Sequence, residues 1–119
     1  MKRIYLIFLL IISFFYSCSY NSEDDLTKDI IVDVVNYEDN IKAIIDTNCI
    51  GCHSNPPVNG APMSLTIYND VKNAVENRGL ISRIESTDSG FGMPFGGPRL
   101  PQNLIDLVIQ WDAEGLIEN

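Results

Sequence analysis

The sequence predicts one all-α domain over residues 36–119. Apolar side chains recur there at three- and four-residue spacing in several segments, a pattern typical of helices packed on a core. Glycine or proline stands where these segments should start or stop, at Gly79, Pro101 and Gly115. The chain has 119 residues, of which 45% are hydrophobic. This length allows one domain and excludes a multidomain enzyme.

The N-terminal segment, residues 1–17, predicts a signal peptide. It begins with the basic pair Lys2-Arg3, and 13 of its residues are apolar. A bilayer-spanning helix needs about 20 apolar residues, so this run has the length of an export signal. An uncleaved N-terminal anchor helix is the alternative.

The pair Ser17-Cys18 closes the apolar run and resembles the lipobox of bacterial lipoproteins. The resemblance implies that Cys18 becomes a lipidated N-terminus. Several acyl chains at that position would hold the protein stably on a membrane. Residues 18–35 then form an acidic tether, whose stretch 21–25 resembles the surface-export signal of Bacteroidetes-type lipoproteins. We expect an exported lipoprotein that is either in the outer membrane or facing the periplasm, with the cell surface as a further alternative.

The charge of the chain excludes some partners. The net charge is -8, and removal of Lys2 and Arg3 leaves 6 basic against 16 acidic residues, a net charge of -10. Such a chain is not expected to bind nucleic acid or anionic lipid headgroups. A basic protein partner is compatible with it.

The most informative motif is Cys49-Ile50-Gly51-Cys52-His53. Cys-x-x-Cys followed directly by His indicates c-type haem attachment. The two thiols add across the two vinyl groups of haem, and the adjacent imidazole donates a nitrogen to the iron. One helical turn places all three side chains on one face of the porphyrin. We therefore expect one covalent haem c.

Three other uses of these residues compete with haem attachment. A disulfide is the default for two cysteines in an oxidising compartment, but it leaves His53 unexplained. A redox-active dithiol usually follows a strand, and no alternating run precedes Cys49. A structural zinc site needs four ligands, and only Cys49, Cys52 and His53 are present.

His53 is the only histidine, so the second axial ligand has to be of another type. Met63 lies ten residues beyond it, a short path to the opposite haem face, and is expected to fill the core. Met93 lies forty residues beyond, in the segment 88–101, which holds four Gly and three Pro. Such a segment can run close over a flat cofactor. Met93 is therefore the predicted distal ligand, although an open sixth position with Met93 nearby remains a variant. His/Met ligation raises the haem potential relative to His/His.

The predicted helices surround this motif. The first covers residues 36–48, with Asn36 and Asp39 as an N-cap pair. In the loop 54–65 that follows, the carbonyl of Pro56 or Pro57 is expected to accept the ring N–H of the ligating histidine.

A second helix should begin at Thr66 or Asn69, end at Gly79, and be followed by a short helical turn over residues 80–84. The last should start at Pro101 and bury one face that consists of Leu104, Leu107, Val108 and Trp111. Residues 26–35 are ambiguous between a short strand and an extended strip.

The order of helix, haem motif, loop, helix, Gly-rich Met93-Pro94 loop and Trp111-bearing helix resembles the class I cytochrome c domain, in the form of a Bacteroidetes-type monohaem lipoprotein. The resemblance covers about residues 36–117. It implies a small cytochrome c-like fold, three main helices around one covalent haem. Its thioether cysteines match Cys49 and Cys52, its proximal ligand His53 and its distal ligand Met93. The chain departs from the family where Leu100-Pro101 replaces a polar helix cap.

Candidate wall residues of the haem pocket are Leu65, Tyr68, Leu80, Phe91 and Phe95.

The expected function is electron transfer by a membrane-anchored cytochrome that is not itself an enzyme. Its partners would be an oxidase, a reductase or a dehydrogenase. The alternatives are a haem-based gas sensor or ligand binder, in which Met93 is displaced, and a haem-free Cys-x-x-Cys redox or interaction module.

Overall fold

The computed structural model describes residues 33–119. The predicted signal peptide (1–17), the predicted lipidation site Cys18 and most of the predicted tether (18–35) lie outside the described residues. Within the described part the protein is a small all-helical domain with four α-helices and no strand, which confirms the predicted fold class at this level. None of these helices has the length and apolar character needed to cross a membrane.

The first helical segment starts with a π-helical turn, η3 (Tyr37–Ile41), and continues as α2 (Lys42–Asn48). The predicted cap is present: the Asn36 side chain accepts a hydrogen bond from the Asp39 backbone N–H at 2.8 Å. The Asn36 amide also donates to the Asp39 carboxylate at 2.8 Å. This reciprocal pair satisfies a free N–H at the helix start, and the helix then leads directly into the cysteine motif.

The next two helices, α3 (Tyr68–Arg78) and α4 (Leu80–Glu85), are separated only by Gly79. Gly79 has a φ of 64°, the left-handed conformation in which glycine commonly ends a helix. The start of α3 differs from the prediction. Its N-cap residue is Ile67, whose apolar side chain cannot cap a helix, and the hydroxyl of the predicted cap residue Thr66 is paired with the Ser64 hydroxyl at 3.0 Å.

The last helix, α5 (Gln102–Ala113), begins one residue after Pro101, which takes the N-cap position. The Pro101 carbonyl accepts from the N–H groups of Leu104 and Ile105, so this end of the helix needs no polar side-chain cap. Trp111 is fully buried, as its position on the apolar face predicts. The helix packs against both η3 and α4.

An aromatic cluster and the C-terminal tail hold the core together. The rings of Tyr37, Tyr68 and Trp111 lie 5.5 to 6.3 Å apart between centroids, within the usual range for stacked and edge-to-face pairs. The Ile117 carbonyl accepts from the Trp111 ring N–H at 2.8 Å and from the Tyr37 backbone N–H at 2.9 Å. The Leu116 carbonyl accepts from the Tyr68 hydroxyl at 2.7 Å. The tail therefore ties η3, α3 and α5 to one another.

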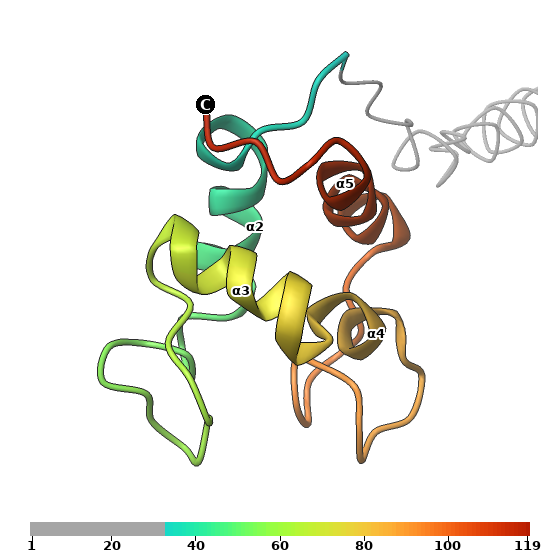
Figure 1. Cartoon of the computed structure of the whole chain (residues 1–119). Coiled ribbons are helices and arrows are strands. Elements are labelled where there is room, and N and C mark those ends of the chain that lie inside the picture. Colours follow the sequence, from blue (N-terminus) through green and yellow to red (C-terminus); the bar gives the residue numbers. More distant parts are fainter. Residues whose placement is uncertain (1–32) are drawn as a thin grey trace, which may run out of the picture.

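Two long loops leave the helical core on the same side, as Figure 1 shows. The first follows the cysteine motif and runs to residue 67, and the second connects α4 to α5 through residues 86–101. The residues with predicted chemistry lie on or beside these two loops. The helical core thus acts as a support, and the candidate site lies where the loops approach each other.

Candidate cofactor site

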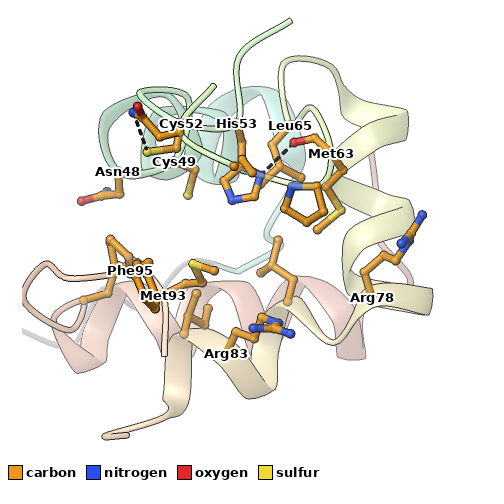
Figure 2. A pocket seen from close by; sticks show the side chains of 18 residues that line it. Asn48, Cys49, Cys52, His53, Met63, Leu65, Arg78, Arg83, Met93 and Phe95 are labelled. Atoms are coloured by element: carbon orange, nitrogen blue, oxygen red, sulfur yellow. Dashed lines mark hydrogen bonds between the residues drawn. The ribbon is translucent and has the colours of Figure 1, made fainter. Parts of the chain in front are cut away.

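A cavity of about 670 Å³ lies between the two loops and is the candidate site. This volume falls within the usual range for small-molecule and cofactor pockets, roughly 300–1,000 Å³. Figure 2 shows Cys49 and Cys52 together at one end of it, with His53 and Met93 projecting into it from opposite sides. The four residues predicted to bind haem covalently or through its iron are therefore brought to one cavity, although Met93 is forty positions from His53 in the chain.

The two thiols are placed by a turn that extends α2. The Cys49 carbonyl accepts from the backbone N–H groups of Cys52 at 3.1 Å and His53 at 2.9 Å. Both cysteines are free thiols. Cys49 is partly buried, and desolvation raises the pKa of its thiol to about 11. Cys52 is exposed, and its sulfur lies 3.6 Å from the Asn59 amide nitrogen.

His53 is buried and its ring is oriented by one hydrogen bond. Its Nδ1 lies 2.8 Å from the Met63 carbonyl oxygen. A carbonyl only accepts, so Nδ1 donates in this bond, and Nε2 is the ring nitrogen left for a metal. The bond to the carbonyl fixes the plane of the ring.

The acceptor differs from the one predicted. The sequence pointed to a carbonyl of Pro56 or Pro57, but the Pro56 carbonyl accepts from the Ser54 hydroxyl at 2.9 Å. The loop returns to the histidine only farther along, where the Leu65 N–H donates to the His53 carbonyl at 2.8 Å. That return brings Met63 beside the ring.

The two candidate methionines lie on different sides of the cavity. Met63 is held beside His53 through its own carbonyl, and Figure 2 shows it on the histidine side. Met93 lies across the cavity from both and is half-buried. An axial ligand opposite His53 must approach from the far side, so this arrangement favours Met93 over Met63.

The predicted wall residues divide into two groups. Leu65 and Leu80 are buried and line the cavity, and Phe95 lines it although 71% of its surface is exposed. Tyr68 and Phe91 are not brought to the cavity, contrary to prediction. Tyr68 faces the aromatic cluster, where Trp111 and the tail carbonyl at residue 116 offer it an apolar ring and a hydrogen-bond acceptor. Phe91 is 41% exposed and lies against the Arg83 guanidinium.

Arg83, Ile84 and Leu100 are among the lining residues that were not predicted from the sequence. Ile84 carried a usable signal, because it is four residues after Leu80 and shares its helix face. Leu100 is buried and directly precedes Pro101. Nothing in the sequence marked Arg83, a charged residue of α4 whose contacts with Phe91 depend on the path of the second loop.

The donor set fits a haem better than a bare metal ion. The cavity presents one imidazole nitrogen and one thioether sulfur from opposite sides, two thiols at one end and a lining that is mainly apolar. A flat apolar cofactor with two reactive edge groups matches these features. Within residues 33–119, no three His, Cys, Asp or Glu side chains gather closely enough to hold a metal ion. A zinc site therefore finds no support in the described part of the chain.

Comparison of the chain with protein-family models, with curated proteins and with solved structures found no match.

Proposed function

We propose that this protein is a membrane-anchored monohaem c-type cytochrome that transfers electrons. In this proposal Cys49 and Cys52 form the haem thioethers, His53 is the proximal ligand, Met93 is the distal ligand, and Cys18 carries the lipid. The observation that carries the proposal is the convergence of His53 and Met93 on one cavity from opposite sides, with two free thiols at its end.

The chain supplies the geometry for this chemistry. A bound haem would supply an iron that alternates between the ferrous and ferric states. The Met63 carbonyl keeps the His53 proton on Nδ1 and points Nε2 into the cavity. Leu65 and Leu80 are buried and line the cavity with apolar side chains, which would keep water away from a bound haem. If His53 and Met93 both bound the iron of such a haem, no open position would remain for a substrate, which is why we propose an electron carrier and not an enzyme.

The exposed end of the cavity is the natural place for electron exchange. Cys52 is exposed, and Phe95 beside the cavity is 71% exposed. A thioether at Cys52 would bring the edge of the macrocycle close to solvent there. A redox partner, an oxidase, a reductase or a dehydrogenase, would dock at this end, and the net charge of the chain favours a basic docking surface on that partner.

The haem-free dithiol alternative is disfavoured by the environment of Cys49. Reactive dithiols depend on a thiolate whose pKa is lowered by nearby positive charge or a helix N-terminus. Burial raises the pKa of the Cys49 thiol to about 11, the opposite direction. Cys49 also stands at the C-terminal end of α2, where the helix dipole disfavours a thiolate.

The experiment is expression of the full chain in a bacterial host that carries the cytochrome c maturation machinery, followed by mass spectrometry. We expect the exported protein to gain the mass of one haem. The double variant Cys49→Ser/Cys52→Ser should lose that mass. The matched control Cys18→Ser should keep the haem and lose only the lipid. A wild-type chain without the haem mass would overturn the proposal.

Carbon monoxide separates the electron carrier from the ligand binder. If Met93 stays on the iron, adding CO to the reduced protein should leave the Soret band in place. A Soret shift at low CO concentration would favour a gas sensor or ligand binder that uses the same haem.

A further inference from the structure

Arg83 is the residue that joins the Met93 loop to helix α4. Its backbone carbonyl accepts from the Met93 N–H at 2.9 Å. Its guanidinium donates from Nη1 to the Phe91 carbonyl at 3.3 Å and lies 4.6 Å from the centroid of the Phe91 ring. One side chain and its own backbone thus hold both Met93 and the residue two positions before it.

The other hydrogen bonds in this loop set its shape and do not attach it near Met93. The Asp88 carbonyl accepts from the N–H groups of Phe91 and Gly92, and the Asp88 carboxylate accepts from the Gly90 N–H. These bonds lie within the turn itself. The second attachment to α4 comes from Arg99, whose Nε donates to the Glu85 carbonyl at 3.0 Å, six residues beyond Met93.

The backbone before Met93 is also closely packed. A Cβ on Gly92 would lie 3.0 Å from the Asp88 carbonyl oxygen and 3.2 Å from the Ser86 carbonyl oxygen. Backbone atoms cannot move aside as flexible side chains can. The turn is therefore tight at Gly92, and the direction of the next residue depends on how the turn is fastened to α4.

The position of Arg83 relative to the cavity completes the argument. Arg83 and Met93 both line the cavity, and Figure 2 shows them on the same side, across from His53. A thioether is a neutral metal ligand, so its affinity for a metal depends strongly on how well the protein positions it. Partners that orient a metal ligand typically change its affinity by about 10- to 100-fold when they are removed.

We propose that Arg83 is a positioning residue that holds Met93 at the sixth coordination position, acting through the planar guanidinium on Phe91. This inference rests on the proposed function. The planar group matters because a guanidinium can stack on a ring and donate along its own plane at the same time. Lysine keeps the charge but cannot do both.

The test compares four forms of the haem-loaded full chain: wild type, Arg83→Met, Arg83→Lys and Arg99→Met. The readouts are the Met–iron charge-transfer band of the ferric protein and CO binding to the ferrous protein. In Arg83→Met we expect the band to be largely lost and the CO affinity to rise by about 10- to 100-fold. Arg83→Lys should behave nearly the same, since it retains only the charge. Arg99→Met removes a comparable bond between an arginine and an α4 carbonyl, and should keep the band.

Retention of the Met–iron charge-transfer band in Arg83→Met overturns the positioning role of Arg83 and leaves the proposed function intact. Retention in Arg83→Lys alone would mean that charge and not the planar contact matters, which also overturns it. Equal loss in Arg99→Met would show that any loosening of the loop suffices, and would overturn a specific role for Arg83. A wild-type chain without covalent haem overturns this inference together with the proposed function.

Discussion

The two walls of the cavity are built in different ways. On the histidine wall, the loop after the cysteine motif closes on itself, through the bonds of the His53 ring to the Met63 carbonyl and of the Leu65 N–H to the His53 carbonyl. On the methionine wall, Met93 is half-buried on a Gly- and Pro-rich loop that is fastened to α4 mainly by Arg83. The comparison teaches that His53 is fixed by burial and local bonds, whereas Met93 depends on a few contacts at the surface.

The largest expected difference between the walls is in the free energy of unfolding. Leu65 is 3% exposed and Phe95 is 71% exposed, and both line the cavity. Leu65→Ala should cost about 2–5 kcal/mol, because it removes buried methyl groups and leaves a void. Phe95→Ala should change stability by no more than about 0.5 kcal/mol. Urea denaturation of the haem-loaded full chain measures both, and equal losses would remove the distinction between the walls.

Amide hydrogen exchange should show a difference of intermediate size. The Leu65 N–H and the Met93 N–H each donate one backbone bond of similar length, 2.8 and 2.9 Å. The Met93 bond lies in a segment that is more exposed, and such segments open locally at lower free energy. We expect Met93 to exchange at least about tenfold faster than Leu65, a difference of about 1.4 kcal/mol in opening free energy. Equal protection of the two amides in the haem-loaded protein would mean that the loop of Met93 is as rigid as the loop of Leu65.

The smallest expected effect lies away from both walls, and serves as a reference for them. The Glu114 carboxylate accepts from the Gln110 side chain at 2.8 Å and from the Val35 N–H at 2.6 Å. These bonds, that from Gln110 first, lower the pKa of Glu114 below its ordinary value of 4.5. Because the folded pKa is the lower one, the stabilisation is present above pH 4.5 and is lost as the pH falls through the folded value.

The matched variant for this contact is Glu114→Gln, which keeps an acceptor oxygen and removes the titration. Between about pH 5 and pH 3 the urea midpoint should fall slightly more in the wild type than in this variant. Identical pH profiles for the two proteins would show that the carboxylate contact contributes nothing measurable. The Met–iron band of Glu114→Gln should match that of the wild type, since Glu114 lies in the turn after α5 and does not line the cavity.

Local features of the fold were predictable because they depend on neighbouring residues. The cap by Asn36, the helix end at Gly79 and the buried face around Trp111 each follow from a residue type at a fixed place in a helix. The start of α3 was not predictable in this way. Thr66 is a good cap residue by type, but its hydroxyl is engaged by Ser64, a contact that depends on the path of the loop.

In the candidate site, the spacing of Cys49, Cys52 and His53 was enough to predict that the three residues lie close together. The structure has them within one turn, in which the Cys49 carbonyl accepts from the N–H groups of Cys52 and His53. The carbonyl that orients His53, the methionine that lies opposite it and the contacts of Arg83 with the methionine loop became known only from the fold. These arrangements involve residues 8 to 40 positions apart, on loops with no repeating pattern. Their partners are set by how the loops return to the helical core, which no local propensity records.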